Sequence, residues 1–184
     1  MKKIILVLIL LLTSCVSTGM NDLDKIWEKE NKEIFNKIGI REYIGITKEQ
    51  AIKAMVIAFQ RLDIIIENSD FKVGTLTGTA IAPKPISYDE FQTVIAVENA
   101  RAQSTAGPFF VWTLRGFNSK YNIIYLEIPN GVQISIRANL RYTGRTDMIA
   151  IQNFPPKATE IAIKKIWNEF EKIEFIQRAT LKKR

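Results

Sequence analysis

The sequence contains no histidine and only one cysteine, Cys15. Without an imidazole, the chain cannot form a Ser-His-Asp or Cys-His nucleophile system, a histidine-ligated metal site or a histidine pH switch. A single thiol excludes an internal disulfide and a zinc site built from several thiolates. The composition therefore excludes several of the commonest catalytic and metal-binding arrangements before any motif is considered.

The rest of the composition is that of a globular protein. The chain has 184 residues, of which 47% are hydrophobic, and carries 26 basic against 19 acidic side chains. This length suits one domain with attachments, and it is well above the size at which disulfides or metals become necessary for stability.

The first fifteen residues have the pattern of an export signal. Lys2 and Lys3 precede nine apolar residues, 4–12, which are too few to cross a hydrocarbon core that requires about 20. The segment closes with Leu12-Thr13-Ser14-Cys15. These four residues resemble the lipobox of bacterial lipoproteins. The resemblance implies that residues 1–14 are a signal peptide cleaved before Cys15, and that the thiol and the new amino group of Cys15 carry acyl chains such as palmitate.

Two other interpretations of this segment remain open, namely an ordinary secretory signal with an incidental cysteine and a chance apolar N-terminus. If Cys15 is lipidated, several acyl chains together make a stable membrane anchor, whereas one chain is marginal. Val16 follows the cysteine, where in enteric lipoproteins an aspartate would favour the inner membrane. We therefore expect the periplasmic face of the outer membrane, with the periplasmic side of the inner membrane as the alternative. An exported lipoprotein is not expected to bind nucleic acid.

The predicted organisation has three parts after the signal. Residues 15–46 form the lipidated N-terminus, a tether and a short amphipathic helix that either packs on the domain, the favoured interpretation, or meets a partner or the membrane surface. Residues 47–177 form the globular domain, and residues 178–184 form a basic tail. The apolar residues of the amphipathic helix are Leu23, Ile26, Trp27, Ile34, Phe35 and Ile38.

Three helices are predicted within the domain. The first begins with the capping box Thr47-Lys48-Glu49-Gln50 and ends near Leu62. The second begins with the capping box Ser87-Tyr88-Asp89-Glu90, ends at about Ala102 and is followed by a loop over 103–108. Pro155-Pro156 opens a third helix, expected to lie across the sheet. Its apolar stripe comprises Ile163, Ile166, Trp167, Phe170 and Ile173.

Four runs rich in β-branched and aromatic residues predict strands, with turns at Asn118-Ser119 and Asn130-Gly131. They span residues 71–82, 109–117, 121–129 and 132–142. In the first run, Gly74 and Gly78 share one face and leave a groove, which the protein's own helix fills more often than a ligand does. The element order predicts an α+β, two-layer sandwich in which an antiparallel sheet of about four strands packs on helices.

The last strand alternates between apolar and polar side chains, which predicts one covered face and one exposed face. The predicted inward residues are Ile134, Ile136, Ala138, Leu140 and Tyr142, and the outward residues are Gln133, Ser135, Arg137, Asn139 and Arg141.

Four features of the sequence point to one family. They are the lipobox, the strand Phe71-Lys-Val-Gly-Thr-Leu-Thr-Gly, the strand Gln133-Ile-Ser-Ile-Arg-Ala and the helix Ile166-Trp-Asn-Glu-Phe-Glu-Lys-Ile-Glu-Phe. Together they resemble small bacterial lipoproteins with helix-grip domains, of which BamC-type lipoproteins are the best known. The resemblance covers residues 47–177 and implies a helix-grip fold and a role beside the outer-membrane assembly machine. Unlike BamC-type proteins, this chain has one such domain and not two.

Motifs for catalysis are not found. Ser119-Lys120 lacks the spacing of S-x-x-K, and Gly74 and Gly78 lie inside a strand and not at the strand-to-helix turn of a phosphate loop. We therefore predict no catalytic, cofactor or metal residues and a non-enzymatic protein. An enzyme that uses only carboxylates or lysine remains the third alternative.

An arginine row is the main candidate for binding. Arg137, Arg141 and Arg145 recur at i, i+4 and i+8 on the outward face, and Arg115 is expected on a neighbouring strand with Tyr121 or Tyr125 nearby. Guanidinium groups suit phosphate or carboxylate, so an anionic headgroup or an acidic protein face would fit here. In the other interpretation, these charges merely keep an exposed sheet face soluble.

The leading hypothesis is an interaction or envelope-assembly accessory module. The alternative is a carrier of a hydrophobic ligand held between the sheet and the C-terminal helix, and a pocket of about 300 Å³ or more would favour it. Ordinary core packing also accounts for the aromatic residues that would line such a cavity. They are Phe109, Phe110, Trp112, Trp167 and Phe170.

Overall fold

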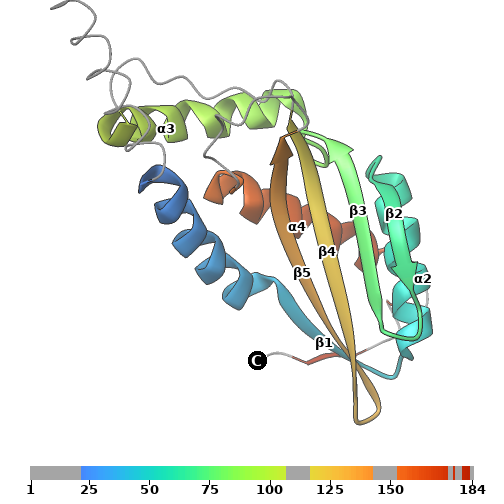
Figure 1. Ribbon diagram of the computed structural model, residues 1–184. Helices are drawn as coiled ribbons and strands as arrows, with labels where there is room; N and C mark the ends of the chain where they lie inside the picture. Colours follow the sequence, from blue (N-terminus) through green and yellow to red (C-terminus); the bar gives the residue numbers. More distant parts are fainter. Residues whose placement is uncertain (1–21, 107–116, 143–152, 174–175, 177–179, 183–184) are drawn as a thin grey trace, which may run out of the picture.

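The computed structural model describes residues 22–106, 117–142, 153–173, 176 and 180–182. A single antiparallel sheet of six strands, in the order β2-β3-β4-β5-β1-β6, has helices packed on one face (Figure 1). The predicted α+β class is confirmed, with six strands in place of about four. The strands are β1 (Ile40–Ile44), β2 (Ile65–Asp70), β3 (Thr75–Ile81), β4 (Phe117–Ile128), β5 (Gly131–Tyr142) and the short β6 (Thr180–Lys182).

The helices are an N-terminal helix over residues 22–38, α2 (Lys48–Arg61), α3 (Tyr88–Ala106) and α4 (Pro156–Glu171). Both predicted capping boxes are present. The Gln50 amide donates to Thr47 Oγ1 at 3.2 Å and Gln50 Oε1 accepts from the Thr47 amide at 2.9 Å, and Ser87 and Glu90 make the same reciprocal pair. These side chains satisfy amides that a helix start otherwise leaves unpaired.

Helix α3 is longer than predicted. It continues to Ala106, so the predicted loop from Gln103 is wrong over its first four residues. The reason is local: nothing between Ala102 and Ala106 breaks a helix, and the first strong breakers in the sequence, Gly107 and Pro108, come later.

The hairpin of β4 and β5 is confirmed, but its turn lies one residue earlier than predicted. Ile128 pairs with Gly131, so the two-residue loop is Pro129-Asn130, with Asn130 at a φ of 59°. The predicted turn at Asn118-Ser119 is wrong, because both residues lie inside β4 and pair with β3 and β5. Pairing on both sides overrides the weak preference of these residues for turns.

Two predicted boundaries are corrected by the sheet. β1 lies between β5 and β6, so the domain begins before Thr47, and Thr180–Lys182 form β6 within the predicted basic tail. The strand predicted over 71–82 is shortened to β3, preceded by β2 and a turn over 71–74. β1 and β2 were not predicted, because their polar residues give no clear alternation. β1 is defined by pairing with the distant strands β5 and β6, and β2 by pairing with the next strand, β3.

The core lies between the inner face of the sheet and helices α2 and α4. The predicted inward residues of β5 from Ile134 to Leu140 are buried, as is the whole predicted stripe of α4. A Cβ at Gly78 would lie 2.6 Å from Phe59 Cε2, so α2 packs directly on this glycine. The groove predicted at Gly78 is therefore filled by the protein's own helix.

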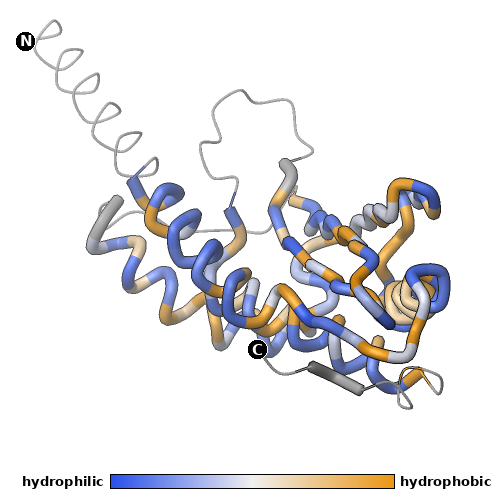
Figure 2. The backbone as a smooth tube through the Cα atoms, turned by 90° about the horizontal axis from the view of Figure 1, so that it is seen from below, coloured by the Kyte–Doolittle hydropathy of each residue, from blue (hydrophilic) through white to orange (hydrophobic). Residues whose placement is uncertain are grey.

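The opposite face of the sheet is not covered by any described helix (Figure 1). In Figure 2 the helix of residues 22–38 alternates between hydrophilic and hydrophobic positions, as expected for an element with one packed face. None of the helices in the described ranges combines the length and apolarity needed to cross a bilayer.

Candidate functional site: the cleft between residues 22–38 and β5

The N-terminal helix is anchored to the domain at its first two turns. Leu23 and Trp27 are fully buried, and Arg101 of α3 forms a bidentate pair with Glu30, with nitrogen to oxygen distances of 2.8 and 2.5 Å. This contact confirms the favoured interpretation that the amphipathic helix packs on its own domain.

Polar contacts also fix this helix to the segment that leads into α4. Asp24 Oδ1 accepts from the Asn153 amide at 2.9 Å, and Asn31 Nδ2 donates to the Phe154 carbonyl at 2.8 Å. The helix is therefore a rigid wall beside the sheet.

Gly39 ends this helix directly against β5. Its amide donates to the Phe35 carbonyl at 2.8 Å, and its own carbonyl accepts from the Ile136 amide at 2.7 Å. A Cβ at Gly39 would lie 2.7 Å from Phe35 Cδ2 and 3.0 Å from the Ile136 carbonyl oxygen, so only glycine permits this approach. From this junction, the helix and β5 diverge (Figure 1).

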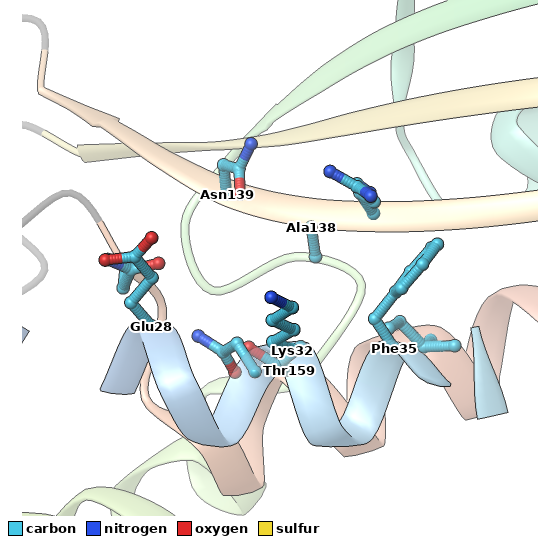
Figure 3. A pocket seen from close by; sticks show the side chains of 10 residues that line it. Glu28, Lys32, Phe35, Ala138, Asn139 and Thr159 are labelled. Atoms are coloured by element: carbon cyan, nitrogen blue, oxygen red, sulfur yellow. The ribbon is translucent and has the colours of Figure 1, made fainter. Parts of the chain in front are cut away.

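A cleft of about 420 Å³ occupies the space between the diverging elements. Figure 3 shows Lys32 and Phe35 projecting from the helix toward β5, while Ala138 points from β5 toward the helix. The lining residues come from the helix (Glu28, Asn31, Lys32, Phe35), from β5 (Arg137, Ala138, Asn139) and from the α4 region (Asn153, Thr159, Ile163).

The charged groups of the cleft are available for a ligand. Arg137 lies over the Phe35 ring, 4.4 Å from its centroid, in a cation–π contact that orients the guanidinium. Within the described residues, Glu28, Lys32 and Arg137 form no ion pair. Asn31 Oδ1 is buried and finds no hydrogen-bond donor among these residues. The cleft thus presents two cations, one carboxylate and one unpaired acceptor.

The predicted arginine row is only partly described. Arg137 lies at the cleft, and Arg141 lies four residues further along β5, where it pairs with Asn118 of β4. Arg145, Arg115 and the predicted lipidation site Cys15 lie outside the described residues.

The tyrosines predicted beside this row are on the other face of the sheet. Tyr121 and Tyr125 are buried in the core, and burial raises the pKa of both phenols above the ordinary value. Tyr121 pairs with the inward residue Ala138, and its hydroxyl donates to the Lys84 carbonyl at 2.7 Å. The prediction is wrong because odd-numbered residues of β4 face inward.

The aromatic residues predicted to line a ligand cavity instead fill the core where the structure describes them. Trp167 and Phe170 are fully buried with ring centroids 5.8 Å apart, and Tyr43 of β1 contacts both rings. The Trp167 indole donates to the Ile38 carbonyl at 2.8 Å. Phe109, Phe110 and Trp112 lie outside the described residues.

An ion pair closes this aromatic cluster at its edge. Glu171 accepts hydrogen bonds from Arg41 and from the Tyr43 hydroxyl, the latter at 2.6 Å, and the Arg41 guanidinium lies 4.8 Å from the Trp167 ring centroid. Burial and the neighbouring Glu171 carboxylate raise the pKa of Tyr43. These contacts hold β1 and α4 together, so this cluster is structural.

The sequence patterns did not single out Lys32, Gly39 or Ala138 as site residues. Helical spacing does place Glu28, Lys32 and Phe35 near one face of the helix, and this was the one signal present. Across the described ranges, no group of three His, Cys, Asp or Glu side chains is arranged to hold a metal ion.

Comparisons with protein-family models, with curated proteins and with solved structures found no match to this chain. Function is therefore inferred from the chemistry of the cleft and from the N-terminal motif.

Proposed function

We propose that this protein is a lipid-anchored lipoprotein of the cell envelope, held through Cys15 at the periplasmic face of the outer membrane, where it acts as a non-enzymatic interaction or assembly accessory module. The observation that carries the proposal is the cleft, in which Lys32 and Arg137 have no ionic partner among the described residues. Exposed cations in a preformed concave site favour binding of a polar, anionic partner.

The position of the anchor supports this role. Six residues separate Cys15 from Asp22, where the described helix begins, and the seven steps between the two residues reach at most about 25 Å. One wall of the cleft would therefore stay close to the bilayer surface, where envelope proteins meet.

The carrier function is the second candidate, because the cleft exceeds the volume of about 300 Å³ that a small ligand needs. Its lining favours a polar occupant over an acyl chain, since Glu28, Lys32, Arg137 and two asparagines lie beside Ala138. Burying these charges against hydrocarbon would cost several kcal/mol for each ion.

Site-specific crosslinking in the native bacterium tests the interaction function. A photoreactive amino acid replaces Lys32 in the cleft or, as a matched control, the exposed Lys53 of α2, which does not line the cleft. We expect a discrete protein adduct from position 32 and none from position 53. The Cys15→Ala variant should leave the membrane fraction and lose the adduct, because it lacks the anchor.

Equal adducts from both positions, or none from position 32, would contradict a role for the cleft. A Cys15→Ala variant that stays in the membrane fraction would contradict lipid anchoring. A lipid adduct at position 32 in place of a protein adduct would favour the carrier function.

A further inference from the structure

We infer that the cleft binds an extended, acidic peptide segment of a partner protein, which pairs as an additional antiparallel or parallel strand with the free edge of β5. This inference rests on the proposed function and names the partner's chemistry. It follows from the register of the sheet, the direction of the β5 backbone groups and the charges at the cleft.

Within the described residues, β5 is paired along only part of the edge that faces β1. Its partner β1 starts at Ile40, opposite Ser135, and the last contact on this side is the hydrogen bond from the Ile136 amide to the Gly39 carbonyl. Beyond Ile136, no strand among the described residues pairs with this edge, although β5 continues to Tyr142. The N-terminal helix diverges from the edge there, and the cleft lies between them.

The backbone groups of alternate residues at this edge face the β1 side of β5, on which the cleft lies. In an antiparallel strand, the amide and carbonyl of alternate residues face the same neighbour. Since the Ile136 amide faces the β1 side, the amides and carbonyls of Ala138 and Leu140 face that side too, while Arg137 faces β4 opposite Asn122. Ala138 also lines the cleft. A main-chain ladder is thus available at two successive positions.

The opposite edge of the sheet is protected against such pairing. β2 carries a register irregularity between Ile66 and Asn68, and Glu67 at that point pairs with Lys120 of β4 at 3.7 Å. Bulges and charged side chains are common devices that block edge-to-edge association. β5 has no register irregularity against β4 over Ala138 and Leu140, and its Arg137 has no ionic partner among the described residues, which marks this edge as the one suited to strand addition.

Charge selects the kind of peptide. Lys32 and Arg137 outnumber Glu28 at the cleft, and none of them is neutralised by a described residue. An aspartate or glutamate on the incoming strand can reach these cations, whereas a basic peptide would be repelled by them. The main chain would supply affinity, and this charge pattern would supply specificity.

The test uses the full chain purified in detergent and fluorescent heptapeptides in which valine alternates with glutamate or, as the control, with lysine. We expect the glutamate peptide to bind at least about tenfold more tightly than the lysine peptide. N-methylation of the peptide bonds that face β5 should weaken binding by about tenfold, because it removes the ladder donors.

Hydrogen exchange gives a second signature of strand addition. On binding, the amides of Ala138 and Leu140 should exchange more slowly, while the amide of Arg137, already directed toward β4, should be unchanged. Protection of every second residue distinguishes a new ladder from general burial of the cleft.

Variants of the protein complete the test. Ala138→Pro removes one amide that faces the cleft and no ladder bond to β4, and it should abolish peptide binding. Lys32→Ala and Arg137→Ala should each weaken binding of the glutamate peptide by about fivefold, while Lys53→Ala should not. The N-methylated peptides keep the inference testable if Ala138→Pro does not fold.

Three results would overturn strand addition. The first is equal binding of the glutamate and lysine peptides, and the second is no effect of N-methylation on binding. The third is binding of N-acetylglutamate as tight as that of the heptapeptide, which would indicate a small-anion site. If these peptides fail while position 32 still forms its specific protein adduct in cells, the proposed function stands and this inference falls. Loss of the adduct as well would reject both.

Discussion

Two regions beside α4 differ in packing: the region where β1 contacts α4 is closed, and the region between the N-terminal helix and β5 is open. At the β1 end, Tyr43, Trp167 and Phe170 pack into a closed aromatic cluster, and the ion pair of Arg41 with Glu171 seals its edge. At the other end, the N-terminal helix that precedes Gly39 diverges from β5, and a cleft of about 420 Å³ lies between them.

Comparing the two ends shows that the cleft results from small side chains in its lining and from the position at which β1 begins. Ala138 and Thr159 take the positions where large residues would be needed to fill the space, and no described strand replaces β1 along β5. The closed end supplies stability through buried aromatic area, and the open end leaves charges and backbone groups free to bind.

The largest expected effect on the free energy of unfolding comes from a substitution at the closed end. Trp167→Ala should lower the free energy of unfolding by about 3–5 kcal/mol, because it removes a fully buried ring and leaves the Ile38 carbonyl without its donor. Denaturant unfolding of the two proteins measures this. Trp167→Phe, which keeps a ring and loses the hydrogen bond, is the control and should cost less. An alanine variant as stable as the wild type would mean that this end is not close-packed.

An intermediate effect on the free energy of unfolding is expected where α3 contacts the N-terminal helix, which forms one wall of the cleft. Glu98 of α3 is buried beside Trp27, with Arg101 and Glu30 nearby, and desolvation raises the pKa of its carboxyl. The folded state therefore prefers the protonated form. The stability that this group contributes is complete below its unfolded pKa near 4.5 and is lost as pH rises through its folded pKa.

Glu98→Gln should remove this pH dependence. We expect the variant to be more stable than the wild type at pH 7 and nearly equal to it at pH 4, with an effect smaller than that of Trp167→Ala. Thermal unfolding across this pH range measures the difference. Glu160→Gln is the matched control with the opposite sign, because the nearby Lys157 and Lys164 lower the pKa of Glu160 to about 2. A Glu98→Gln variant that is less stable at pH 7 would contradict the assignment.

The smallest effect on stability is expected at the open end. Arg137→Ala removes an exposed guanidinium that lies over the Phe35 ring and forms no ion pair with the described residues, so the free energy of unfolding should fall by about 0.5 kcal/mol or less. Denaturant unfolding beside the Trp167 variants gives the comparison. A loss of about 2 kcal/mol or more would mean that Arg137 is part of the packed structure, and the contrast between the two ends would fail.

Local patterns predicted much of the fold. Both capping boxes, the hairpin of β4 and β5, the inward residues of β5 from Ile134 to Leu140 and the buried stripe of α4 depend on short-range spacing, and all of them are confirmed. The errors at the end of α3 and at the hairpin turn are local, whereas another error lies where distant segments meet. Asn118 and Ser119 favour turns locally, but pairing with β3 and β5 keeps them in a strand.

For the candidate site, the sequence identified Arg137 and the amphipathic helix separately. It could not place them together, because the contact between Phe35 and Arg137 joins residues about a hundred positions apart, and the close approach at Gly39 depends on the backbone of β5. Tyr121 and Tyr125 were assigned to the wrong face because the turn predicted at Asn118-Ser119 obscured the alternation of β4.

By itself, the sequence determined the absence of imidazole chemistry and the α+β class, and it predicted export and lipidation at Cys15, since each depends on residue types or on short-range periodicity. Only the tertiary structure decided that β1 starts opposite Ser135, so that no strand in the described part of the chain pairs with the edge at Ala138. Strand pairing joins residues far apart in the chain, so no local pattern encodes which edge of a sheet stays open.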